Sequence, residues 1–162
     1  MRFIVILGVL LVAGATGLFA DQADKAVGYW KSISDVKGEE GKVTAIWKLS
    51  VTSAGELQGA IVFVPDESPT KIYVSKKKEY NGLPVWGTLW MKGLKKSGAD
   101  SWGGGTIVDV GNDKADVYGC EVKVIANATK LDMRGYIGFA FIGRTQTWVA
   151  VSEDEVKKLL GK

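Results

Sequence analysis

The chain has 162 residues, a single cysteine and no histidine, and its formal net charge at neutral pH is +3. One cysteine excludes an internal disulfide. The lack of histidine excludes Ser–His and Cys–His nucleophile activation as well as typical zinc sites. A charge this small gives only weak steering towards nucleic acid, so we expect no nucleic-acid partner.

Residues 1–20 have the layout of a secretory signal peptide, with a basic start, an apolar run over Phe3–Val12 and small residues after it. The apolar run is shorter than the roughly 20 residues that cross a bilayer as a helix. We therefore predict cleavage after Ala20, with Ala15 and Gly17 as alternatives. The mature protein is expected to be periplasmic or secreted, without an integral membrane domain. An uncleaved membrane anchor is the alternative interpretation.

Residues 21–162 are predicted to form a single all-β domain. Apolar and polar residues alternate in several short segments, which is typical of half-buried strands. The residues that share a face in these segments are Val43, Ala45, Trp47, Leu49 and Val51, then Leu57, Ile61 and Phe63, then Tyr118, Cys120 and Val122, and finally Leu131 and Met133. Ile46 breaks the alternation. So many short strands favour a closed antiparallel up-and-down β-barrel, because a flat sheet would expose its edges.

The segment Pro65–Pro84 is irregular and is predicted to be a long loop or an edge strand. In the run of Asp109, Asp113 and Asp116, the spacing fails the usual calcium loop because Gly111 stands at a ligand position. We therefore predict a solvated turn there. Neither a metal site nor a cofactor is expected.

A short C-terminal helix is predicted after Ser152. Ser152 and Glu155 have the spacing of a capping box, and Val156, Leu159 and Leu160 form a small apolar stripe. A helix of two turns is not stable alone, so we expect it to pack on the wall of the barrel.

The chain has six tryptophans, and the parity of the predicted strands indicates which side chains face the inside of the barrel. A barrel of about eight strands holds either its own side chains or one small ligand. By parity, Trp47, Phe63, Tyr118 and Met133 are the candidate cavity residues, and we predict a small apolar or amphipathic ligand. Cys120 shares their parity and is predicted to be a buried, inert thiol.

The alternative is a side-chain-filled barrel that serves as an interaction or structural module of the cell envelope. In that case Trp86, Trp90 and Trp102 would be exposed anchors for a partner that the sequence does not specify. We expect no enzymatic activity and assign no catalytic residue, because the usual acid–base partner is missing. A hydrolase with paired carboxylates stays formally open.

Gly28-x-Trp30 resembles the start of a lipocalin or related calycin barrel. In those folds the tryptophan crosses one end of the barrel and a basic residue near the last strand stacks on it. The resemblance implies a barrel-closing group of Gly28, Trp30, Arg144 and Trp148. It predicts Arg144 within about 6 Å of the Trp30 ring.

A longer series of motifs covers most of the chain: GYWKS, ELQGAIV, VWGTLWMKGLKK, WGGGTIVDV, YGCEVKV and RGYIGFAFIGRTQTW. In this order they resemble the bacterial family called domain of unknown function 2147. The resemblance implies an exported protein with a lipocalin-like barrel and no established activity. The chain departs from the family pattern between Phe63 and Pro84, where a pair of cysteines is expected and none is present. A redox or disulfide role there does not carry over.

Overall fold

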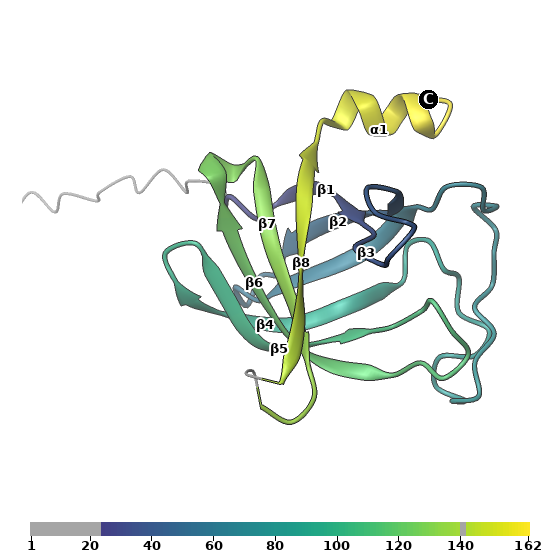
Figure 1. The fold of residues 1–162 in the computed structure, drawn as a ribbon, viewed down its shortest axis with the longest axis horizontal. Coiled ribbons are helices and arrows are strands. Elements are labelled where there is room, and N and C mark those ends of the chain that lie inside the picture. Colours follow the sequence, from purple (N-terminus) through teal and green to yellow (C-terminus); the bar gives the residue numbers. More distant parts are fainter. Residues whose placement is uncertain (1–23, 140–141) are drawn as a thin grey trace, which may run out of the picture.

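A closed antiparallel β-barrel forms the body of the protein (Figure 1). The computed structural model describes residues 24–139 and 142–162, so the predicted signal peptide at residues 1–20 lies outside the described residues. The elements are β1 (Gly28–Ile33), β2 (Val43–Val51), β3 (Leu57–Phe63), β4 (Leu89–Gly98), β5 (Ser101–Val108), β6 (Val117–Ile125), the short 3-10 turn η1 (Ala126–Ala128), β7 (Lys130–Tyr136), β8 (Gly143–Val151) and α1 (Glu153–Leu159).

Each strand pairs with the next along the chain, and β8 returns to pair with β1. At this seam Trp30 lies opposite Ala150 of β8 on one side and opposite Trp47 of β2 on the other. The predicted all-β, up-and-down barrel is confirmed. The first strand also meets the last strand, as the two end motifs predicted.

The predicted contact between Trp30 and Arg144 is wrong. Trp30 is in register with Ala150, whereas Arg144 lies at the start of β8, opposite Gly135 of β7. Six residues of extended chain span about 20 Å, well beyond the range of a cation–π contact. The indole N–H of Trp30 instead donates to the carbonyl of Ala26 at 2.8 Å. The barrel closes through strand pairing, and no cation of residues 24–139 or 142–162 lies over this ring.

The C-terminal helix accounts for the apolar residue that broke the alternation in β2. Ile46 points out of the barrel and packs with Val151 and Val156 in a second apolar cluster beneath α1. Ser152 caps the helix by accepting a hydrogen bond from the backbone N–H of Glu155 at 3.2 Å. The predicted helix is therefore confirmed, and Figure 1 shows it outside the barrel beyond the end of β8.

Side chains fill one end of the barrel, which we call the closed end. The buried residues there are Trp30, Leu49, Leu57, Leu94, Trp102 and Leu131. The segment before β1 covers them, because Ala26 is buried and Asp24 forms an ion pair with Lys96. This packing leaves the other end as the place where a cavity can form.

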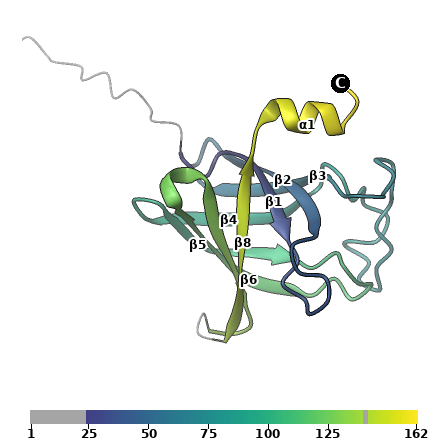
Figure 2. The ribbon, with the colours of Figure 1, turned by 45° about the horizontal axis from the view of Figure 1, so that its top comes forward.

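Long connections gather at that other end, which we call the open end (Figure 2). Residues 64–88 join β3 to β4 without a regular strand, apart from an isolated bridge between Ile72 and Pro84. Tyr73 anchors this segment, since its side chain is buried and its hydroxyl donates to the carbonyl of Asn112 in the loop between β5 and β6. The long loop predicted for Pro65–Pro84 is thus confirmed.

Candidate functional site

A cavity of about 1080 Å³ enters the barrel from the open end. Its volume lies at the upper limit of the range usual for small-molecule sites. The apolar and aromatic residues of its wall include Ala45, Trp47, Ile61, Tyr73, Val85, Ile107, Tyr118, Met133 and Trp148. The polar residues include Ser32, Ser34, Thr44, Arg144 and Gln146.

Two stacked indole rings lie deepest in the cavity. The rings of Trp47 and Trp148 are 5.2 Å apart between centroids and inclined by 24°. Both residues line the cavity, whereas the closed-end residues Leu49 and Leu131 do not. The stack therefore forms the floor of the cavity. A flat ligand group can lie on it in the offset geometry that aromatic pairs prefer.

Strand order and parity bring most of the predicted cavity residues together. Trp47, Tyr118 and Met133 lie in the wall, on β2, β6 and β7. Their role in binding stays a prediction. The expected position of Phe63 is wrong. It packs outside the barrel, with its ring 5.6 Å from that of Trp86.

A β-bulge explains the position of Phe63. Ile46 is in register with Phe63, while the next residue, Trp47, is in register with Ile61. Val62 is the extra residue in β3, and an extra residue turns every later side chain to the opposite face of the sheet. Phe63 consequently shares the outer face with Ile46.

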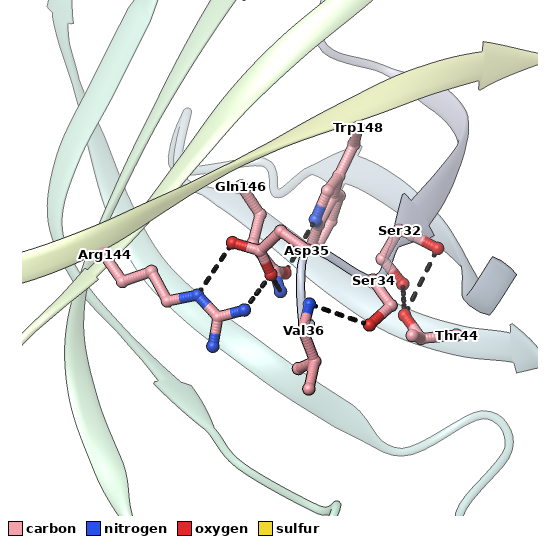
Figure 3. Close-up of polar contacts among 8 residues, drawn as sticks. All are labelled: Ser32, Ser34, Asp35, Val36, Thr44, Arg144, Gln146 and Trp148. Carbon is pink, nitrogen blue, oxygen red and sulfur yellow. Dashed lines mark hydrogen bonds and ion pairs between the residues drawn. The ribbon is translucent and has the colours of Figure 1, made fainter. Parts of the chain in front are cut away.

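Hydroxyl groups on β1 and β2 form a polar strip on one wall of the cavity (Figure 3). The hydroxyls of Ser32 and Thr44 are 2.7 Å apart, and the Ser32 hydroxyl also donates to the carbonyl of Ala45 at 3.2 Å. The Ser34 hydroxyl accepts from the backbone N–H of Val36 at 3.2 Å. The hydroxyls of Ser32 and Thr44 hold the end of β1 against β2, and all three residues line the cavity.

An ion pair stands at the mouth beside this strip. The guanidinium of Arg144 donates to both carboxylate oxygens of Asp35, with the Nε bond at 2.9 Å. The amide Nε2 of Gln146 lies 3.4 Å from the same carboxylate. The Gln146 Oε1 accepts from the indole N–H of Trp148, also at 3.4 Å. Figure 3 shows this chain of contacts running from the mouth to the floor.

The cavity tyrosines stay protonated at neutral pH. Burial raises the pKa of the Tyr118 hydroxyl, and the carboxylates of Asp116 and Asp109 add to this effect. Burial likewise raises the pKa of Tyr73. Both hydroxyls therefore offer hydrogen bonds and no charge. Among residues 24–139 and 142–162, no cluster of three or more histidine, cysteine, aspartate or glutamate side chains could hold a metal ion.

Residues 28–150 match the family described as an uncharacterized protein conserved in bacteria, DUF2147. The chain belongs to this family. Its fold is also similar to that of a solved structure, protein HP1028 from the human pathogen Helicobacter pylori, which is described as belonging to the lipocalin family. The TM-score is 0.68 at 18% identity, over 83% of this chain and 88% of HP1028. At that identity the likeness establishes a lipocalin-like fold. A comparison with curated proteins found no significant match.

The tryptophans of this DUF2147 barrel argue against its use as a filled module with exposed anchors. Trp90 and Trp102 are each only 1% exposed, so they cannot anchor a partner at the surface. The Lys96 ammonium lies 3.7 Å from the Trp102 ring centroid and covers it at the closed end. Trp86 is partly buried against Phe63. The alternative in which Trp90 and Trp102 are exposed anchors is therefore wrong.

Cys120 is fully buried in this DUF2147 barrel, as its parity predicted. Burial raises the pKa of its thiol to about 12, and the nearby carboxylate of Glu121 acts in the same direction. The thiolate is the reactive form of cysteine, and it is scarce at neutral pH when the pKa is that high. Cys120 thus behaves as a small apolar core residue.

Sequence reasoning missed Asp35 and Gln146. Gln146 carries a usable signal, because it lies two residues from both Arg144 and Trp148 and so shares their face of the strand. Asp35 lies in the loop after β1 and reaches Arg144 only through the closure of the barrel. Within the described part of this family member, no helix is long and apolar enough to span a membrane.

Proposed function

We propose that the protein binds a small amphipathic molecule in the barrel cavity and leaves it chemically unchanged. The observation that supports this most strongly is the open cavity of about 1080 Å³, with a floor of stacked indoles and a polar strip on one wall. Apolar walls with a few placed polar groups are typical of ligand sites. The lining offers hydrogen bonds and apolar surface, and histidine, the usual general base, does not occur in the chain.

The expected affinity is moderate. Burying about 400 Å² of apolar ligand surface gains roughly 10 kcal/mol at the usual area coefficient. The loss of translational and rotational freedom opposes this by about 4–15 kcal/mol. At its favourable limit this balance is about 6 kcal/mol, which corresponds to a dissociation constant of roughly 40 μM.

A cavity-filling substitution tests the proposal. Nile red, an uncharged dye that fluoresces in apolar surroundings, should bind the folded protein saturably with a dissociation constant of roughly tens of micromolar. Ala45 is 6% exposed and lies in the cavity wall. Ala45→Trp should weaken dye binding about tenfold or more, because the new ring occupies the space that a ligand would fill.

The matched control is Ala60→Trp, which makes the same change on the outer face of β3, where Ala60 is in register with Lys48 and Leu89. It should leave dye binding within about twofold of wild type, since it leaves the area buried by the dye unchanged. Circular dichroism should show that both variants fold. Absence of saturable binding to the wild type, or an equal loss in both variants, would contradict the proposal.

We also propose that the protein acts in the bacterial periplasm. The predicted signal peptide and membership in a bacterial family support this location. N-terminal sequencing of the protein from a periplasmic extract should begin at Asp21. A chain that keeps residues 1–20 and stays in the cytoplasm would contradict export.

A further inference from the structure

At the mouth of the cavity, the charges of Arg144 and Asp35 cancel one another. Arg144 makes two hydrogen bonds to Asp35, so its positive charge is matched by a carboxylate at contact distance. A bidentate pair of this kind is among the strongest and most directional polar contacts in proteins. A ligand that approaches Arg144 therefore meets a pair with no net charge. The guanidinium N–H groups that do not bind Asp35 can still donate hydrogen bonds to it.

Most other charges of the lining have partners as well. Glu67 forms an ion pair with Lys71, and Glu39 lies 3.8 Å from Lys42. Asp109 accepts hydrogen bonds from the backbone N–H of Gly111 at 2.8 Å and from the Asn112 amide at 3.0 Å. Among the described lining residues, each cation, Lys71 and Arg144, has a carboxylate within ion-pair distance. The site thus offers no uncompensated positive charge to an anion.

Gln146 supplies a neutral recognition point between mouth and floor. Its amide donates towards Asp35 and accepts from Trp148, and both distances are 3.4 Å, near the upper limit for a hydrogen bond. Such long bonds are readily exchanged for shorter ones. A ligand hydroxyl or amide can donate to Oε1 and accept from Nε2, which no purely anionic or quaternary ammonium group can do.

From this arrangement we infer that the cavity selects amphipathic molecules with an uncharged polar group, such as a hydroxyl or an amide, over those with an anionic group. The inference rests on the proposed function. An anionic group must leave its water shell to enter the cavity, and no unpaired positive charge among the described lining residues compensates it. Asp109, a lining carboxylate whose partners are neutral N–H groups, adds repulsion against an anion. A neutral hydroxyl loses less hydration and finds both a donor and an acceptor in Gln146.

Three probes with the same apolar tail test the selection: decan-1-ol, decanoate and decyltrimethylammonium. Each is titrated against the protein with bound Nile red, and displacement of the dye gives its affinity. Decan-1-ol should bind about tenfold or more tightly than decanoate, because no lining cation compensates the desolvation of the anion. Decyltrimethylammonium, which Asp109 can attract, is the probe of opposite charge. Gln146→Leu, which removes the neutral donor and acceptor, should reduce this advantage several-fold while Nile red still binds.

Two single substitutions should switch the preference. Asp35→Asn leaves the Arg144 charge unmatched, so decanoate should gain about tenfold in affinity. Arg144→Gln leaves Asp35 unmatched, so decyltrimethylammonium should gain instead. The double variant Asp35→Asn with Arg144→Gln is neutral again and should restore the preference for decan-1-ol. It also controls for loss of the ion pair as a structural contact.

The outcomes separate the two proposals. If Nile red does not bind the wild type, the proposed function fails. If the dye binds but wild type binds decanoate as tightly as decan-1-ol or more tightly, the inference on the uncharged group is overturned. If a single variant does not fold, the double variant decides, because a preference for decanoate over decan-1-ol in that variant, whose residues 35 and 144 are both neutral, would likewise overturn the inference.

Discussion

Trp30→Ala should lower the free energy of unfolding by about 3–5 kcal/mol, as deletion of a large buried aromatic side chain does. Trp30 is 2% exposed and lies between Trp47 and Ala150, where the first strand joins the last. The substitution would leave a cavity at the closed end. It would also leave the Ala26 carbonyl without the indole N–H that now donates to it. Chemical denaturation followed by circular dichroism measures the loss.

Trp30→Phe is the matched control for this prediction. It retains an aromatic ring in the core and removes the indole N–H, so we expect a smaller loss of about 1–2 kcal/mol. The difference between the two variants reports the packing of the ring. A loss below about 1 kcal/mol for Trp30→Ala would show that this residue does not hold the seam.

Gly105→Ala should cost about 3 kcal/mol of stability, the upper part of the usual range for overpacking. An added Cβ at Gly105 would lie 2.6 Å from two side-chain carbons of Leu94 and 2.6 Å from the backbone carbonyl oxygen of Lys92. Leu94 is fully buried, and the backbone of β4 is held by its pairing with β5. Neither neighbour can move away cheaply. Thermal unfolding should show the loss as a clear fall in Tm.

Gly103→Ala provides the comparison within the same strand. An added Cβ there would meet the Cγ of Glu121 at 3.4 Å, an ordinary van der Waals contact. Because alanine restricts the unfolded chain more than glycine does, we expect a neutral effect or a gain of up to about 1 kcal/mol. Equal losses for Gly103→Ala and Gly105→Ala would contradict the explanation by close packing.

The barrel was predictable because the alternation of polar and apolar residues is a local property. In β2, Ala45, Trp47 and Leu49 face inward as their parity predicts. In β6 and β7, Cys120 and Met133 do the same. The capping pattern at Ser152 and Glu155 is equally local. Closure of the sheet followed from the number of strands and the need to protect their edges.

The errors concern features that depend on non-local register. In β3 the predicted inward parity holds as far as Ile61, and the bulge at Val62 turns Phe63 outward. A bulge in one strand is defined by its partner strand. Arg144 lies near Trp148 in the sequence, but the distance from Arg144 to Trp30 depends on which end of β8 meets β1. No pattern within either strand contains this information.

Part of the candidate site lies in loops, where the alternation of polar and apolar residues does not predict which side chains are buried. Tyr73 and Val85 belong to the irregular connection between β3 and β4, yet both are buried and line the cavity. Their positions depend on contacts with other segments, such as the hydrogen bond from Tyr73 to the carbonyl of Asn112. The size of the cavity is therefore a property of the folded loops as much as of the strands.

The placement of α1 has a consequence for how the barrel resists local opening. β1 and β8 share three register pairs, whereas β7 and β8 share seven. The helix lies across this short seam, where Val156 packs on Ile46 and Val151, and Glu155 pairs with Lys31 at 2.6 Å. Strands with few ladder bonds exchange their amide hydrogens through small openings. The stability of the β1–β8 seam against local opening thus depends on α1, which packs on the outside of the barrel.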